Sequence, residues 1–167
     1  MKLNGRTKSL IRWIPALILM VVIFSFSAQD APTSSKVSTE VVELLDPIVE
    51  PITRKMTPVQ KQDFKTSFHD TVRKSAHFLI FLLLGAAFMF ALAPYNFKGL
   101  LCHFISVGLS FVYACTDEFH QSFVSGRGPA FTDVLIDTAG ALIGVLIFWG
   151  VRTLVKKIKN KKKTKKA

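Results

Sequence analysis

The sequence predicts an all-α polytopic membrane protein, built as a bundle of four transmembrane helices with a partly helical extracytoplasmic segment between the first two. Half of the 167 residues are hydrophobic, and the mean hydropathy is positive, at +0.37. The apolar residues are gathered in blocks instead of recurring at the spacing of a soluble core. A helix that crosses a hydrocarbon layer of ~30 Å needs about 20 residues. The long charge-free runs extend from Trp13 to Gln29, Ser75 to Phe97, Gly99 to Thr116 and Thr138 to Val151.

The first run predicts a membrane helix over residues 11–28. A cleaved signal peptide is the alternative, because a basic segment precedes the run and Ser25-Phe26-Ser27 has the small residues of a cleavage site. The run is slightly long for a signal peptide and further spans follow it. These two points favour an uncleaved helix.

The second predicted membrane helix covers residues 74–93 and follows an outer segment, 29–73. Within that segment, Thr57-Pro58-Val59-Gln60 has an N-cap residue, a proline at the first helical position and a glutamine at the third. The helix can therefore begin outside the membrane, near Pro58, and continue into it.

The third and fourth helices are predicted over residues 98–116 and 131–152. The last charge-free run is too short to span a membrane unless its helix begins near Ala130. That start brings two carboxylates into the membrane boundary. A single helical stripe then contains Asp133, Asp137, Gly140 and Gly144. The two glycines form a Gly-x-x-x-Gly element of close helix packing, so the stripe is expected to face the bundle.

The distribution of charge orients the chain. Residues 1–12 contain four basic and no acidic residues, and residues 152–167 contain nine basic and no acidic residues. The positive-inside rule places both termini and the loop at Lys98 in the cytoplasm, with 29–73 and 117–132 outside. The prediction is one multi-pass membrane domain, 1–152, followed by a basic cytoplasmic tail, 153–167. The net charge is +11, and the basic residues are expected to bind anionic lipid at the membrane surface, not nucleic acid.

Short motifs for known chemistry are absent from the sequence. It has no Walker motif, GxGxxG, HExxH or GxSxG, so no cofactor is assigned. Cys102 and Cys115 lie roughly 20 Å apart along one predicted helix, too far for a disulfide. The candidate functional residues are instead polar groups beside apolar runs, where charge is costly and usually retained for a reason.

These polar groups all fall at the predicted outer ends of the helices. His77, Asp117, Glu118 and Asp133 are the candidate catalytic residues, and the candidate binding residues are Arg73, Gln121, Arg127, Gln29 and Asp137. His77 would act as general acid or base, with Asp117 or Glu118 as its partner. The two arginines would hold an anionic head group. No short-spaced metal-ligand motif is present, although His77 with Asp117, Glu118 and Asp133 would supply nitrogen and oxygen donors.

At these residues the chain resembles the VanZ-like family of bacterial membrane proteins. The matching pieces are Phe26-Ser27-Ala28-Gln29 with Ser35 and Ser38, Arg73 to Phe78, Asp117 to Phe123 with Gly126-Arg127, and Asp133 with Gly140 and Gly144. Asp137 departs from the family, where many members have asparagine. The resemblance implies a role in the cell envelope, and the namesake's association with reduced teicoplanin susceptibility implies a link to glycopeptides. It implies no particular reaction.

Several functions stay open on the sequence. The polar layer predicts a site for an anionic lipid-linked or cell-wall-related ligand, or a glycopeptide, in contact with membrane lipid. That site would belong either to an enzyme or to a non-catalytic binding protein. Alternatively, the layer is a structural network in which Arg73 and Arg127 neutralise Asp133 and Asp137. A small transporter is less favoured, because the polar residues stop at one level. The sequence assigns no oligomeric state.

Overall fold

The described part of the chain is entirely helical, as predicted. A computed structural model provides the coordinates. It describes residues 4–29, 44, 47, 49–95, 97, 100–125, 128 and 130–164. The elements in chain order are α1 (Gly5–Ile11), α2 (Ile14–Ser27), α4 (Pro58–Leu92), the short 3₁₀ helix η1 (Ala93–Tyr95), α5 (Leu101–Gln121) and α6 (Phe131–Thr164). The predicted helix over 11–28 corresponds to α2. The short helix α1 comes before it, and a two-residue turn separates the two. Pro15 lies in the first turn of α2, where its missing N–H is not needed.

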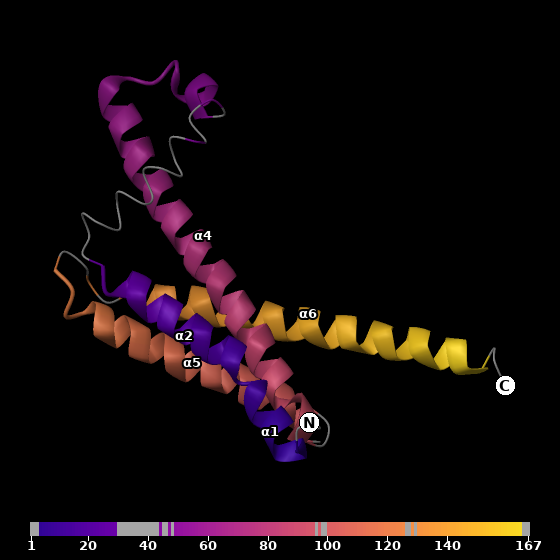
Figure 1. The fold of residues 1–167 in the computed structure, drawn as a ribbon. Helices are drawn as coiled ribbons and strands as arrows, with labels where there is room; N and C mark the ends of the chain where they lie inside the picture. The colour runs from indigo at the N-terminus through magenta and orange to yellow at the C-terminus, as the bar shows by residue number, and fades with distance from the viewer. Residues whose placement is uncertain are drawn as a thin grey trace.

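The helix α4 begins where the sequence predicts. Thr57 caps it by accepting a hydrogen bond from the backbone N–H of Gln60, and the Gln60 side chain accepts one from the N–H of Thr57. From Pro58 the helix continues for 35 residues without interruption. Its N-terminal part rises away from the other helices, and its C-terminal part packs among them (Figure 1).

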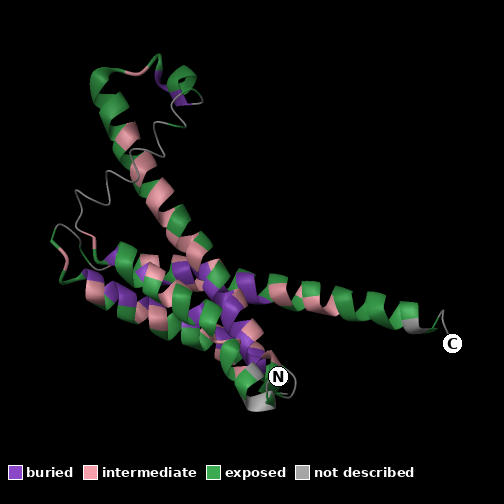
Figure 2. Ribbon diagram, in the orientation of Figure 1, coloured by how far each residue is buried: buried purple, intermediate pink, exposed green. Residues whose placement is uncertain are grey.

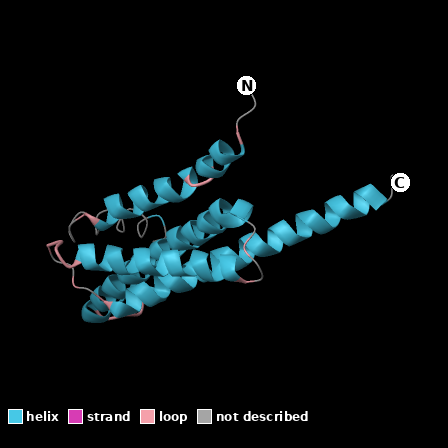
Figure 3. Cartoon of the chain, turned by 90° about the horizontal axis from the view of Figure 1, so that it is seen from below, coloured by secondary structure: helices cyan, strands magenta, loops and turns pink. Residues whose placement is uncertain are grey.

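The helix α6 is longer than the predicted span of 131–152. It has no break at residue 152 and continues through the basic segment to Thr164. Figure 1 shows this C-terminal half extending beyond the bundle. The most extensive helix pairing is between α4 and α6, and α2 and α5 complete the bundle beside them (Figure 1). Figure 3 shows the chain from below, with the C-terminal end extending away from the other helices.

Three glycines bring α4 and α6 into close contact. A Cβ atom at Gly140 would overlap the carbonyl oxygen of Phe78, and one at Gly144 would overlap that of Leu82. Across the same interface, a Cβ at Gly85 would overlap the carbonyl oxygen of Ala141. Side chains at these positions would force the helices apart, so only glycine permits this backbone approach. The predicted packing role of Gly140 and Gly144 is confirmed, and we call this contact the glycine seam.

The outer faces of the bundle are apolar. On α2, for example, Leu17, Val21 and Phe24 are each more than half exposed. Buried residues instead concentrate where the helices meet (Figure 2). An apolar surface of this extent is typical of a protein surrounded by lipid. The segments that are long and apolar enough to cross a membrane are Ser9–Ser27, Pro58–Tyr95 and Phe131–Lys162.

The helix α5 is not among these candidate spans. It carries His103 near one end and Asp117, Glu118 and His120 near the other, which lowers its hydropathy. Its buried Ser106 and Ser110 donate hydrogen bonds to backbone carbonyls one turn earlier in the same helix. The structure therefore gives three candidate spans, and the fourth remains a prediction. The outer segment 30–43 lies outside the described residues.

Candidate functional site

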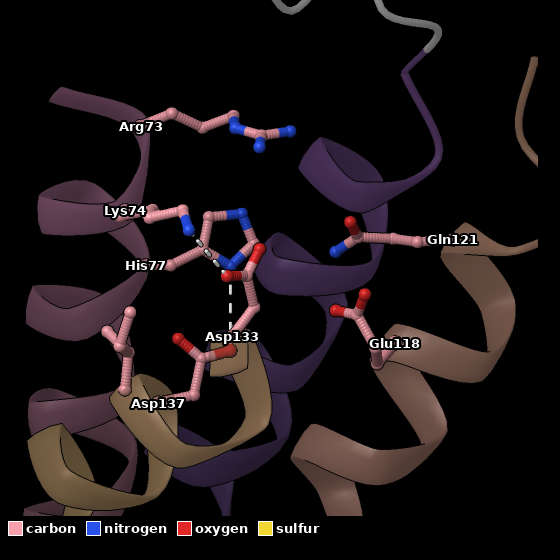
Figure 4. A pocket seen from close by; sticks show the side chains of 8 residues that line it. Arg73, Lys74, His77, Glu118, Gln121, Asp133 and Asp137 are labelled. Atoms are coloured by element: carbon pink, nitrogen blue, oxygen red, sulfur yellow. Dashed lines mark ion pairs between the residues drawn. The ribbon is translucent and has the colours of Figure 1, made fainter. Parts of the chain in front are cut away.

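Four helices meet at one level of the bundle. There α2 and α5 end, α6 begins, and α4 passes through, so residues far apart in the sequence come together (Figure 1). A small cleft at this level is lined by Arg73, Lys74, His77, Glu118, Gln121, Asp133, Ile136 and Asp137. Its free volume of ≈ 10 Å³ is near the minimum for a single water molecule. Figure 4 shows the labelled side chains projecting into this space from α4, α5 and α6.

Of the predicted site residues, six line this cleft, and their roles stay predictions. They are Arg73, His77, Glu118, Gln121, Asp133 and Asp137. Asp117 lies beside the cleft, and its ligand atoms approach His77 and Asp137. Gln29 is half-buried just beyond α2 and does not line the cleft. Arg127 lies outside the described residues.

Asp117 is held by neutral donors. Its carboxyl group is only 4% exposed. Its Oδ2 accepts hydrogen bonds from Ser27 Oγ at 2.8 Å and from Gln121 Nε2 at 3.0 Å. Gln121 Nε2 also donates to Ser27 Oγ at 3.2 Å. The three groups therefore fix one another, and they connect the end of α2 to the end of α5. By contrast, Ser25 is exposed and donates to the Val21 carbonyl.

The ion pairs differ from those expected. The structural alternative has Arg73 and Arg127 neutralise Asp133 and Asp137. Arg127 lies outside the described residues, and the Arg73 guanidinium approaches Asp70, at 3.9 Å. Asp133 pairs instead with Lys74, at 3.0 Å between Nζ and Oδ1. Asp137 pairs with His77, at 3.7 Å between Oδ2 and Nδ1 (Figure 4). Lys74, one residue after Arg73, takes the position beside Asp133 that this alternative gave to an arginine.

Lys74 lines the cleft but is not among the site residues predicted from the sequence. It directly follows Arg73 in the chain. Because α4 and α6 cross in close contact, the aliphatic stem of Lys74 can carry its ammonium group to α6. A count of basic residues beside the second apolar run could have included it, since Arg73 and Lys74 lie in the same turn of α4.

Glu118 is buried and connects α5 to the start of α6. Its Oε1 accepts a hydrogen bond from the backbone N–H of Ala130, at 2.6 Å. Burial raises the pKa of Glu118; the Ala130 N–H opposes this, while nearby carboxylates, Asp133 first, reinforce it. A raised pKa makes the protonated form of Glu118 easier to reach than that of a solvent-exposed glutamate.

One group of side chains could hold a metal ion. His77, Asp117 and Asp137 each offer a ligand atom, and these atoms all lie within 4.8 Å of one another. The group shares two residues with the donor set considered from the sequence, but Asp137 replaces Glu118 and Asp133. Neither cysteine belongs to this group, and both are free, as predicted, along α5.

Comparison with known proteins assigns the family. The profile of the VanZ/LLP1 family matches residues 12–155. This range contains every residue of the cleft and all three glycines of the seam. Searches of curated proteins and of solved structures return no match. Because the family match covers most of the chain, and its helices are those of a membrane protein, we conclude that this chain is a membrane protein belonging to the VanZ/LLP1 family.

Proposed function

We propose that this protein acts in the cell envelope by binding the anionic head group of a lipid-linked ligand at the mouth of the cleft, at the outer end of the bundle. Both termini would lie in the cytoplasm, as the lysine distribution favours. Family membership supports a role in the envelope. The ligand class rests on the observations below.

The observation that carries the proposal is the position of Lys74 and Ile136. Both residues line the polar cleft, and both also line an open groove of ≈ 510 Å³ on the surface of α4 and α6. The other walls of this groove include Phe78 and Leu79. A polar cleft that continues into a largely apolar groove fits a molecule with a charged head and a hydrocarbon chain.

Two cations can meet the head group. Arg73 and Lys74 are partly exposed, and Arg73 extends across the mouth of the cleft (Figure 4). The 3.9 Å contact between Arg73 and Asp70 is long and exposed, so it restrains the guanidinium weakly. A phosphate or carboxylate would receive the forked hydrogen bonds of Arg73 and the charge of Lys74.

The first experiment measures binding. Purified protein in nanodiscs is offered a radiolabelled polyprenyl phosphate, phosphatidylglycerol or the uncharged polyprenol. We expect the polyprenyl phosphate to be retained and the polyprenol not. The variant Arg73→Ala/Lys74→Ala should bind at least about tenfold more weakly, because it loses charge-assisted hydrogen bonds. The matched control, Lys61→Ala/Lys65→Ala, removes two charges from the same helix outside the cleft. Equal binding of phosphate and alcohol would overturn the proposal.

The same incubation distinguishes an enzyme from a binding protein. Release of a labelled product by the wild-type protein, lost in His77→Gln, would establish catalysis. Retention without product would establish binding alone. The structural alternative is tested in cells: if Arg73→Ala, His77→Ala and Asp117→Ala proteins reach the membrane and keep the wild-type phenotype, the cleft is only a structural network. Teicoplanin susceptibility of a deletion strain is the phenotype that family membership suggests.

A transporter is less well supported. Toward the other end of α4 and α6 the contact is the glycine seam, where backbone meets backbone. The buried hydroxyl groups of Ser106 and Ser110 on α5 bond to their own helix. Among the described residues, this leaves no continuous row of ionisable groups from the cleft to the opposite end.

A further inference from the structure

Three helices each direct one metal-ligating side chain to the same point. His77 comes from α4, Asp117 from α5 and Asp137 from α6, with all three ligand atoms within 4.8 Å of one another. Asp117 and Asp137 are each only 4% exposed. No sequence motif relates these residues, since each belongs to a separate helix. Their meeting is a product of the fold.

Each of the two carboxylates has an oxygen without a hydrogen-bond partner. Oδ1 of Asp117 and Oδ1 of Asp137 are buried and accept no hydrogen bond from the described residues. Leaving a buried charged oxygen unpaired costs several kcal/mol. Two such atoms beside a histidine therefore indicate that a positively charged group completes the site.

The cations near the cleft do not fill this role. Lys74 is paired with Asp133 at 3.0 Å, and Arg73 lies 3.9 Å from Asp70. His77 reaches Asp137 Oδ2, at 3.7 Å. Within the described chain, no Lys, Arg or His nitrogen lies within 4.0 Å of an Asp117 oxygen. A proton shared between His77 and Asp137 would still leave Asp117 uncompensated.

We propose that His77, Asp117 and Asp137 bind one divalent transition-metal ion of the Zn²⁺ type. One imidazole and two carboxylates make a mixed nitrogen and oxygen donor set, which suits Zn²⁺ better than Mg²⁺. At metal–ligand distances near 2.1 Å, tetrahedral ligands lie about 3.4 Å apart. The 3.7 Å between His77 and Asp137 is close to that value. The other ligand atoms lie within 4.8 Å of one another, so binding of the ion would draw them together by up to about 1.4 Å.

The surrounding groups are arranged as a metal site requires. Ser27 and Gln121 hydrogen-bond to Asp117 Oδ2, which fixes the orientation of the carboxylate and leaves Oδ1 available. Partners of this kind hold ligands in place in known metal sites. Three protein ligands leave a fourth position for water or for an oxygen of a bound ligand, the pattern of catalytic zinc sites.

This metal site does not depend on the proposed lipid ligand, and its test uses the metal alone. Purified full-length protein is stripped with chelator, and Zn²⁺ binding is measured by calorimetry and elemental analysis. We expect one Zn²⁺ per chain and no comparable binding of Mg²⁺. Co²⁺ should give the intense visible bands of a four-coordinate ion. Folded wild-type protein that binds no stoichiometric Zn²⁺ would overturn the proposal.

Variants then locate the ion. Asp117→Asn, Asp137→Asn and His77→Gln should each weaken Zn²⁺ binding about 100-fold or more, since loss of even a supporting partner costs 10- to 100-fold. His120→Gln is the matched control, because His120 is also on α5 but packs against Phe24. Unchanged binding in all three site variants, or equal loss in the control, would contradict the assignment. If a variant fails to fold, the wild-type protein alone tests the site. The Co²⁺ spectrum then reports its ligand geometry, and a Zn²⁺-induced rise in the unfolding temperature reports binding.

The two proposals can fail separately. The variant Arg73→Ala/Lys74→Ala should keep full Zn²⁺ binding while it loses the phosphate lipid. Zn²⁺ binding without lipid binding would leave the metal site standing and remove the lipid proposal. Lipid binding by protein that binds no Zn²⁺ would support the lipid proposal and remove the metal site.

Discussion

The glycine seam and the polar cleft are neighbouring regions of the same helix pair, yet they depend on opposite properties. In the seam, α4 and α6 touch through Gly85, Gly140 and Gly144, which have no side chains to separate them. One turn away, Asp137 turns a charged group toward His77 at the same interface. The close approach at the seam is what brings the cleft residues within reach of one another. The comparison indicates that close backbone packing holds α4 and α6 together at the seam, while polar side chains connect the helices at the cleft.

The largest expected effect is at the seam. Gly144→Ala places a Cβ against the Leu82 carbonyl, so we expect a loss of about 3 kcal/mol or more in the free energy of unfolding, at the upper end for overpacking. Gly150→Ala is the matched control on the same helix, because a Cβ there meets no atom within 4 Å. Thermal unfolding in detergent measures both. Equal stability of the two variants would show that the seam is not needed.

A smaller loss is expected where the cleft supports the fold. Gln121→Leu removes the donor to Asp117 and Ser27. Asp117 Oδ2 keeps the hydrogen bond from Ser27 Oγ but loses that from Gln121, and a lost buried hydrogen bond costs about 1 kcal/mol. The control Gln62→Leu makes the same change at an exposed position of α4. Unfolding temperatures compare the two, and a larger loss in the control would refute a structural role for Gln121.

The pH dependence of Glu118 gives a third, smaller effect. Burial raises its pKa in the folded protein above that of the unfolded chain. Its contribution to stability is therefore complete below the unfolded pKa, near 4.3, and is lost as the pH rises through the folded pKa. The change is at most about 1.4 kcal/mol per pH unit. The unfolding free energy of the wild type minus that of Glu118→Gln should become smaller as the pH rises. A difference that rises would contradict the raised pKa.

The smallest effect on stability is expected at the ion pair of Lys74 and Asp133. Both side chains are partly exposed, at 39% and 24%, so the pair should contribute less than about 1 kcal/mol. Lys74→Met should therefore scarcely change the unfolding temperature, although it should weaken binding of a phosphate lipid. A double-mutant cycle with Asp133→Asn isolates the pair. A coupling free energy of several kcal/mol would show that this ion pair in the cleft, like the glycine seam, contributes strongly to the stability of the fold.

Much of this arrangement could be predicted from local sequence. The cap at Thr57, the proline after it and the Gly-x-x-x-Gly of α6 are signals of a few residues, and all three appear as predicted. Gly85 was missed, because a single glycine in an apolar helix carries no spacing signal. Lys74 was missed because the partner of a long side chain depends on which helix lies opposite.

The sequence by itself determined that the chain is helical, that its helices suit a membrane, and that its polar residues gather at one end. These properties follow from hydropathy, length and charge, which are read along the chain. Only the tertiary structure decided the partners within that end. Lys74 pairs with Asp133, Arg73 turns to Asp70, and His77 meets Asp117 and Asp137. The physical reason is that helix rotation and crossing set contacts within a few ångströms, and close packing at the glycine seam fixes both.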